Sequence, residues 1–185
     1  MNLCTGGWID VVQPGGAHHR CMAPAPAEAA HGHESVWRYP RPPALVLDER
    51  HVVVTFAGVT IAETNSAVRV LETSHPPTFY LPLDDVRRDL LRTAEGASFC
   101  EWKGAAAYVD VAVGDRVAWQ AGWYYPDPSP AYQALHGHLA FYAGRVDRCT
   151  VGGIAVTPQP GGFYGGWITP DVSGPFKGEP GTRGW

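Results

Sequence analysis

Glycine and proline interrupt this chain so often that long helices have little room. The 185 residues include 22 glycines and 17 prolines, which together exceed a fifth of the chain. Proline disrupts helix interiors because it lacks an amide N–H, and glycine does so through its backbone entropy. Between these interruptions apolar and polar residues alternate at a period of two, which is typical of half-buried strands. The pattern predicts a mainly β chain (α+β only in a minor sense) with many turns.

The expected strands fall in two groups separated by a less regular middle. In the first half, ALVLDERHVVVTFAGVTIAET and the residues after it alternate in short runs. The strands predicted there are 45–47, 51–56, 59–63, 67–71 and 78–82. The second half shows strand–turn–strand around a Gly-Asp turn at 114–115 and again around a Gly-Gly turn at 152–153. One or two helical turns are expected between them, in SPAYQALHG.

One short helix is expected near 83–92. Pro82 stands near its start, Asp84 and Asp85 lie near its positive end, and arginines follow. The apolar residues of the segment recur at helical spacing. They would form a buried stripe: Leu83, Val86, Leu90 and Leu91.

The two ends of the chain differ from its middle. Residues 1–33 are rich in Ala, Pro, Gly and His with little periodicity, so we expect a flexible N-terminal extension followed by a single β domain at 34–185. The C-terminal segment is too rich in Gly and Pro for regular structure, yet its aromatic residues need packing partners. We expect it to form an ordered strap over the sheet.

Charge and cysteine spacing exclude several classes of protein. A net charge of −4 gives no electrostatic reason for nucleic-acid binding. No apolar run approaches the roughly 20 residues of a membrane helix, and no secretory signal is recognisable. A cytoplasmic protein without membrane or nucleic-acid partners is therefore expected. The cysteines form no CxxC pair, so neither a structural metal nor a cofactor is expected in the β domain. They are Cys4, Cys21, Cys100 and Cys149.

An ordered set of motifs resembles a known bacterial family. ESVWRYPRPP, RVLETSHPPTFYLP, FCEWKGAAAYVDV, GWYYPDP, LAFYAGRVD and PQPGGFYGGWITPDVSGPFKGEPGT follow one another from about residue 34 to the end. The set resembles the uncharacterised family called domain of unknown function 427. That resemblance implies a compact β-tent-like fold of antiparallel sheets, an architecture shared with methionine sulfoxide reductase B and the thalidomide-binding domain of cereblon. Those relatives often carry a four-cysteine zinc site, for which this chain lacks the CxxC pairs.

The same resemblance brings a nucleotidyltransferase label that the residues do not support. Nucleotidyl transfer usually needs two or three acidic side chains that hold magnesium, beside a turn that cradles phosphate. The adjacent acids Asp84 and Asp85 open the expected helix and are explained as partners of its dipole. There is also no GxSxG segment for a hydrolase and no dinucleotide-binding glycine pattern.

The segment LETSHPPTFYLP, residues 71–82, contains the first candidate for a polar centre. Two prolines follow His75 and hold the chain extended, which limits the entropy lost when the imidazole is oriented. Glu72, Thr73 or Ser74 would hydrogen-bond one ring nitrogen and fix the tautomer. The other nitrogen would then act as base, acid or ligand donor. In the alternative interpretation, both nitrogens only cap carbonyls of the turn.

The segment FCEWKG and the aromatic residues supply the remaining candidates. Lys103 is expected to be a fixed cation for an anionic ligand, unless it is a solvated lysine at the start of a strand. Cys100 is either a nucleophile or a small core residue, and in a strand Lys103 would point to the face opposite Cys100. Glu72 and Glu101 would be acid and base. The residues expected at a ligand, if they are not simply core, are Tyr80, Trp102, Cys100, Trp123 and Tyr142.

Together these residues favour a small-molecule-binding β domain, with or without catalysis. His75 would be its acid/base or polar centre, aided by Glu72, and Lys103 would contact an anionic group of a still unknown molecule. The alternative is a non-catalytic interaction or homodimerisation module that uses exposed aromatic residues. A weaker alternative is metal binding by the N-terminal extension. Its ligands would be His18, His19, His31, His33 and Cys21.

Overall fold

The structure, a computed structural model, describes residues 33–182 and 184–185. The predicted extension at 1–33 therefore lies outside the described residues except for His33. The same is true of the candidate metal ligands of that extension, namely His18, His19, His31 and Cys21.

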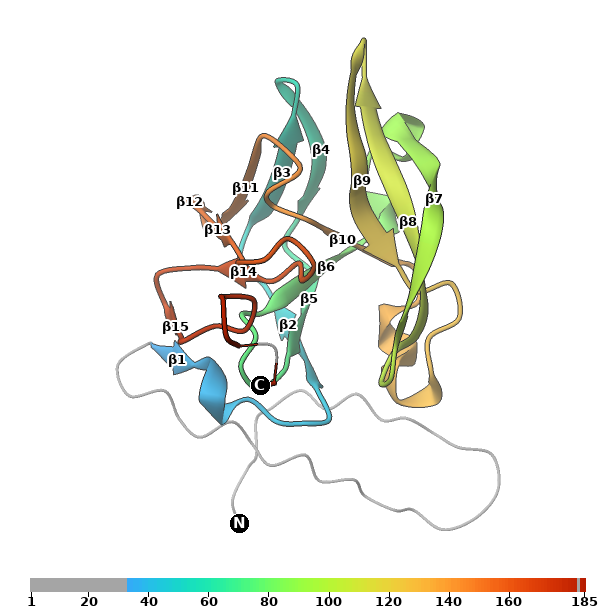
Figure 1. Cartoon of the computed structure of the whole chain (residues 1–185). Helices are drawn as coiled ribbons and strands as arrows, with labels where there is room; N and C mark the ends of the chain where they lie inside the picture. Colours follow the sequence, from blue (N-terminus) through green and yellow to red (C-terminus); the bar gives the residue numbers. More distant parts are fainter. Residues whose placement is uncertain (1–32, 183) are drawn as a thin grey trace, which may run out of the picture.

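The largest sheet of the described residues is antiparallel and has seven strands (Figure 1). Its strand order is β2-β5-β6-β10-β9-β8-β7. The bounds in that order are Ala44–Asp48, Ala67–Leu71, Thr78–Pro82, His138–Phe141, Arg116–Tyr124, Gly104–Val113 and Leu91–Cys100. The long strands β7, β8 and β9 form a twisted ribbon at one end of this sheet (Figure 1).

A smaller four-stranded antiparallel sheet has the order β12-β11-β3-β4. Its bounds in that order are Ile154–Ala155, Arg148–Val151, Val52–Phe56 and Val59–Thr64. Two short pairs complete the strands: β13 (Thr157–Pro158) with β14 (Trp167–Ile168), and β1 (Glu34–Ser35) in parallel with β15 (Val172–Ser173). None of the sheets closes into a barrel, and the predicted mainly β architecture of antiparallel sheets is confirmed.

The predicted strands agree closely with the observed ones in both halves. The five strands expected between residues 45 and 82 correspond to β2 to β6, and the two second-half turns join β8 to β9 and β11 to β12. The helical turns expected in SPAYQALHG form η5, a 3₁₀ segment at Pro130–Leu135. In the part of the chain that the structure describes, no helix is long and apolar enough to cross a membrane.

The region predicted as one short helix is divided into two 3₁₀ turns. These are η3 (Leu83–Asp85) and η4 (Arg88–Leu90), and Leu91 already begins β7. Between the turns Val86 is extended, with φ −114° and ψ 137°, because it bridges to Ala62 of β4. Val86 is buried and the three leucines pack against the core, so the expected apolar side is present without a continuous helix.

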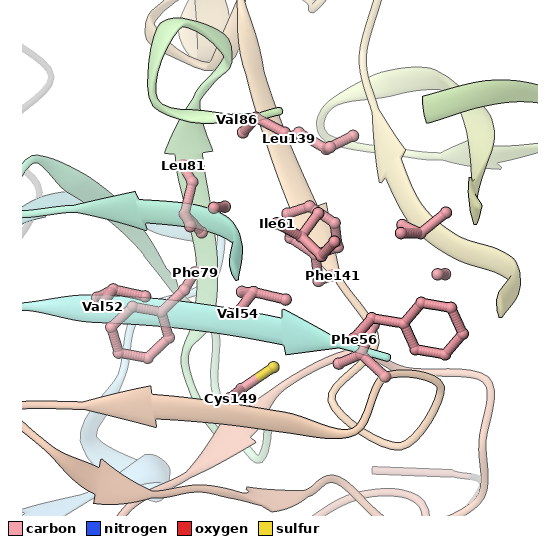
Figure 2. Close-up of a cluster of buried hydrophobic side chains, with 14 of the residues drawn as sticks. Val52, Val54, Phe56, Ile61, Phe79, Leu81, Val86, Leu139, Phe141 and Cys149 are labelled. Atoms are coloured by element: carbon pink, nitrogen blue, oxygen red, sulfur yellow. The ribbon is translucent and has the colours of Figure 1, made fainter. Parts of the chain in front are cut away.

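The main hydrophobic core lies between the two large sheets (Figure 2). The smaller sheet contributes Val52, Val54, Phe56, Ile61 and Cys149, and the larger sheet contributes Phe79, Leu81, Leu139 and Phe141. Because side chains alternate along a strand, Tyr80 points to the opposite face from Phe79 and Leu81. A second cluster, with Tyr80 and Trp123 among its members, covers that opposite face.

The C-terminal segment 158–182, here called the strap, is ordered as predicted. It is drawn in orange to red in Figure 1 and includes β14 and β15. Its Trp167 is fully buried, stacks on Phe79 with ring centroids 5.1 Å apart, and donates its indole N–H to the carbonyl of Phe141 at 2.8 Å. This one side chain fastens the strap to the centre of the fold.

Candidate functional site

A cavity of about 510 Å³ opens on the face of the large sheet that carries Tyr80 and Trp123. Its volume lies in the range of about 300–1,000 Å³ that is usual for small-ligand sites. The strap, the β5–β6 connection and the β7–β8 hairpin surround it. Most of the residues that the sequence suggested for a small-molecule site line this cavity: Glu72, His75, Tyr80, Cys100, Glu101, Trp102, Lys103, Trp123 and Tyr142. Tyr124, a further aromatic candidate of the sequence, packs against the main core instead.

The strand register explains how the aromatic floor of the cavity arises. Tyr80 of β6 is directly opposite Ala140 of β10, which is opposite Trp123 of β9, which is opposite Tyr108 of β8. Residues directly opposite one another in neighbouring strands have side chains on the same face. Four strands therefore place three large rings in one row, and the Tyr80 and Trp123 rings, on either side of the small Ala140, have centroids 6.0 Å apart.

The β5–β6 connection both turns the chain and presents His75 to the cavity. The backbone N–H of His75 donates to the Glu72 carbonyl at 3.0 Å, and the ring Nδ1 lies 3.0 Å from the Thr73 carbonyl oxygen. A carbonyl can only accept, so Nδ1 carries the proton and Nε2 is the acceptor in the neutral ring. Of the three residues expected to fix the tautomer, Thr73 does so, through its main-chain carbonyl. Nε2 bonds to none of the described residues.

The surroundings of His75 favour its neutral form. Burial lowers the pKa of His75 below its ordinary value of 6.5, and the nearby charges of Lys177 and Arg41 act in the same direction. The Thr73 carbonyl and Glu72 oppose this effect without overcoming it. Near neutral pH the ring therefore has an available lone pair on Nε2, which suits a base or a hydrogen-bond acceptor.

Glu72 is already engaged in an ion pair. Its Oε1 lies 3.1 Å from a terminal nitrogen of Arg41 at the edge of the cavity. Glu101, its expected partner in acid–base chemistry, also lines the cavity but is exposed. The structure thus brings both carboxylates to one cavity, where Glu72 is held by Arg41.

Lys103 enters the cavity from a tight turn. β7 ends at Cys100, which pairs with Gly104 at the start of β8, so that Glu101, Trp102 and Lys103 form the hairpin loop. We expected Cys100 and Lys103 to face opposite sides of one strand. That expectation is wrong because the strand ends between them, and both residues line the cavity.

Lys103 is unusual in its electrostatic surroundings. The residue is only 7% exposed, yet no carboxylate of the described residues lies within 4 Å of its ammonium group. Its Nζ lies 5.9 Å from the centre of the Tyr132 ring, which offers partial compensation through a cation–π contact. Lys103 Nζ is not among the fully buried polar atoms that lack a partner, so the ammonium faces the space of the cavity while the rest of the side chain is buried. An uncompensated positive charge in such a low-dielectric wall favours a negative group.

Tyr80 and Tyr142 are hydrogen-bonding groups of the cavity and carry no charge at physiological pH. Trp123 donates its indole N–H to the Tyr80 hydroxyl at 3.0 Å, and burial raises the pKa of Tyr80 far above its ordinary value. Burial likewise raises the pKa of Tyr142 to about 12. Cys100 packs against this aromatic cluster, as a small core residue would.

The strap forms the outer wall of the cavity, which the sequence did not specify residue by residue. The Tyr164 ring meets the His75 ring edge-on, with centroids 4.8 Å apart. Lys177 places its ammonium 5.7 Å from the centre of the Tyr164 ring and donates its backbone N–H to the Ser74 carbonyl at 2.8 Å. The strap therefore both covers the His75 loop and holds it.

The glycines of GGFYGGW are the sequence signal that could have located this wall. A Cβ on Gly165 would lie 2.1 Å from the Trp123 ring, and one on Gly166 would lie 2.6 Å from the Pro76 carbonyl oxygen. A glycine outside helices and strands often marks a position where the backbone approaches another group closely. Phe99 of β7 also lines the cavity, and it was not among the candidate residues because no strand was predicted over 91–100.

The adjacent acids Asp84 and Asp85 lie apart from the cavity. Asp84 pairs with Arg88, and Asp85 accepts a hydrogen bond from Thr64 at 2.6 Å. Because no helix continues beyond η3, the two carboxylates do not stabilise a helix dipole as expected. They are held by Arg88 and Thr64 instead. Within residues 33–182 and 184–185 no group of three or more His, Cys, Asp or Glu side chains is placed to hold a metal ion.

Comparison with known proteins gives a family and no activity. No curated protein matches the chain. A family model described as a domain of unknown function (DUF427) matches residues 44–152, which is more than half of the chain. The cavity residues of the strap, together with Arg41, lie outside the matched range. The match covers four of the six ordered motifs, from RVLETSHPPTFYLP to LAFYAGRVD, whereas ESVWRYPRPP and the C-terminal motif lie outside it. The chain belongs to the DUF427 family.

Proposed function

We propose that the domain binds a small organic anion in this cavity, with Lys103 as the anion contact and His75 as the polar centre. The observation that carries the proposal is the burial of Lys103, without a carboxylate partner among the described residues, in the wall of a cavity of about 510 Å³. A bound anion would supply the missing partner.

The balance of charge around the cavity supports an anionic ligand. Three cationic side chains line it, Arg41, Lys103 and Lys177, against the carboxylates of Glu72 and Glu101. Arg41 is occupied by Glu72, and the Lys177 ammonium donates to the main-chain oxygen of Trp185. Lys103 is the cation whose charge is least compensated, and a low-dielectric wall strengthens its attraction for an anion.

His75 is the second functional group of the proposed site. Its neutral Nδ1–H tautomer leaves Nε2 as an acceptor at the cavity. A ligand that offers a hydroxyl or N–H to Nε2 and an anionic group to Lys103 would be oriented at two points. A neutral ring with a free lone pair on Nε2 is also the form of a general base. We therefore include proton abstraction from the bound molecule in the proposal.

The test is a matched pair of charge-removing variants. Lys103→Gln removes the buried cation, and Arg92→Gln removes an exposed cation of β7 that does not line the cavity. Binding of small carboxylates and phosphates is followed by thermal shift and calorimetry. A charge-assisted hydrogen bond contributes about 1.5–3 kcal/mol, so Lys103→Gln should weaken binding by roughly 10- to 100-fold and Arg92→Gln should leave it unchanged. Equal affinities in the two variants, or no binding by the wild type, would refute the proposal.

The interaction-module alternative has less support. The large apolar residues that are exposed come from separate elements of the fold, among them η2 (Val36–Arg38), β2, β9 and β12. They are Trp37, Leu47, Phe99, Trp119, Ile154 and Phe163. Light scattering that shows a stable dimer at micromolar concentration would favour this alternative.

A further inference from the structure

We infer that the anion bound in this cavity is carried on a planar aromatic ring, and that Phe99 and Phe163 hold this ring at the mouth of the cavity. The inference rests on the proposed function and narrows its ligand to aryl carboxylates and aryl phosphates. It starts from Phe99 and Phe163, the two exposed phenylalanines that line the cavity.

Phe99 and Phe163 are exposed and nevertheless line the cavity. Their exposed fractions are 79% and 68%, and they come from β7 and from the strap, which are far apart in sequence. A single exposed phenylalanine is ordinary on a protein surface. Two of them on one cavity give it an apolar rim, which a bound aromatic ring would cover.

A series of ring contacts leads inward from this rim. Phe163 meets Tyr164 edge-on at 5.0 Å and 87°, and Tyr164 meets His75 edge-on at 4.8 Å and 78°. Tyr142 secures the outer end by donating its hydroxyl to the Phe163 carbonyl at 3.2 Å. Aromatic rings prefer edge-to-face and offset-stacked neighbours, so a flat aromatic ligand would meet favourable partners along the whole path.

The inner part of the cavity is also aromatic, and Lys103 adds a positive charge there. Trp123 and Tyr142 lie with ring centroids 4.4 Å apart, and Lys103 lines the same cavity. An aliphatic anion would satisfy Lys103 but would gain no quadrupole interaction with these rings. A neutral aromatic ring would gain those interactions and leave Lys103 without a partner. An aromatic anion satisfies both parts of the cavity.

The experiment compares ligands that differ only in aromaticity. Benzoate is titrated against cyclohexanecarboxylate, and phenyl phosphate against cyclohexyl phosphate, with inorganic phosphate as the anion without a ring. Aromatic pairs add roughly 2- to 10-fold in affinity each, so the aromatic member should bind about 10-fold more tightly in calorimetry. The carboxylate and phosphate pairs show which anionic group the cavity prefers.

Three variants locate the effect. Phe99→Leu and Phe163→Leu keep apolar side chains but remove the rings, and each should reduce the aromatic preference several-fold while the saturated ligands bind as before. Trp119→Leu is the control, because Trp119 is 71% exposed on β9 and does not line the cavity. Circular dichroism checks that each variant is folded.

The outcomes separate this inference from the proposed function. If none of the anions binds, the proposed function fails and the inference fails with it. If aromatic and saturated anions bind the wild type equally, or if the leucine variants keep the full aromatic preference, the inference is overturned and the proposed function stands.

Discussion

At the scale of single residues, the state of His75 is decided by the main chain around it. The Thr73 carbonyl fixes the proton on Nδ1, and burial under the strap keeps the ring neutral. Neither the main-chain contact nor the burial requires a charged side chain paired with His75. The two prolines after His75 hold the loop in the conformation that makes the carbonyl contact possible.

The lowered pKa of His75 makes stability depend on pH. The unfolded chain binds a proton near pH 6.5, whereas the folded protein resists protonation until a lower pH. Stability contributed by the neutral ring is therefore present above 6.5 and declines as the pH falls toward the folded pKa. Urea unfolding at pH 7.5 and 5.5 should show a larger loss for the wild type than for His75→Asn, whose amide N–H can still donate to Thr73. Equal losses would contradict the expected direction of the shift.

Gly165 offers a second test at this scale. Gly165→Ala would place a methyl group 2.1 Å from the Trp123 ring, so the strap must move away from the cavity floor. Overpacking of this kind costs about 1–3 kcal/mol of unfolding free energy. Gly144→Ala is the control, because its nearest contact would be an ordinary 3.6 Å to Pro158. If the two variants unfold at the same urea concentration, the strap does not depend on this close approach.

At the scale of elements, the β3–β4 hairpin shows a local conflict between sequence and turn. Phe56 pairs with Val59, which leaves Ala57 and Gly58 as a two-residue loop with φ of 51° and 75°. Such a loop suits Asn-Gly, because an alanine in the left-handed region is strained. The backbone N–H of Ala57 also donates to Asp147, a contact that any residue except proline keeps.

Ala57→Asn should therefore stabilise the protein. Relief of the left-handed strain is expected to add about 0.5–1 kcal/mol to the free energy of unfolding, measured by urea denaturation. Ala155→Asn, at an exposed position in the short strand β12, should bring no gain. An unchanged midpoint for Ala57→Asn would mean that the turn relaxes without cost.

The elements also show what the sequence can and cannot reveal. Strands such as β3 alternate between buried and partly buried residues, and the sequence shows this period of two as an alternation of residue types. β7 is an edge strand whose residues are mostly exposed or half-buried, so it leaves no alternating apolar signal. Leu83, Val86 and Leu90 kept a helical spacing because two separate turns face one core. His75, Lys103 and several aromatic residues of the cavity could be named one by one from the sequence, but the wall formed by the strap could not. The meeting of these residues depends on strand register and on the path of the strap.

At the scale of the whole molecule, an ion-pair network joins the strap to the sheet. Arg69 contacts Glu34 at 3.0 Å, and its Nε lies 3.0 Å from Asp48, near enough for an ion pair although without hydrogen-bond alignment. Arg50 binds Asp48 and also reaches Asp171 of the strap at 3.0 Å. The network thus connects β1, β2 and β5 with the segment that closes the cavity.

The same network predicts acid sensitivity. Burial raises the pKa of Asp48, but hydrogen bonds from Arg50 and the charges of Arg50 and Arg69 outweigh it, so that the pKa is lowered overall. The pKa of Asp171 is lowered as well: burial raises it, and hydrogen bonds and the charge of Arg50 outweigh that effect. Carboxylates with depressed pKa stabilise the fold above their unfolded value, near 3.8, and this contribution is lost as the pH falls through the folded value.

Asp48→Asn tests both the network and its link to the cavity. Removal of one partner from a buried ion pair costs about 3–5 kcal/mol, so the variant should be much less stable at pH 7 and should lose less additional stability on acidification than the wild type. Hydrogen exchange should rise in the strap, since Arg50 loses the partner that positions it toward Asp171. Asp89→Asn, in an exposed pair with Arg87, is the control and should behave like the wild type. If exchange in the strap stays unchanged while global stability falls, the strap is held by Trp167 and its backbone bonds alone, and the cavity wall is independent of the network.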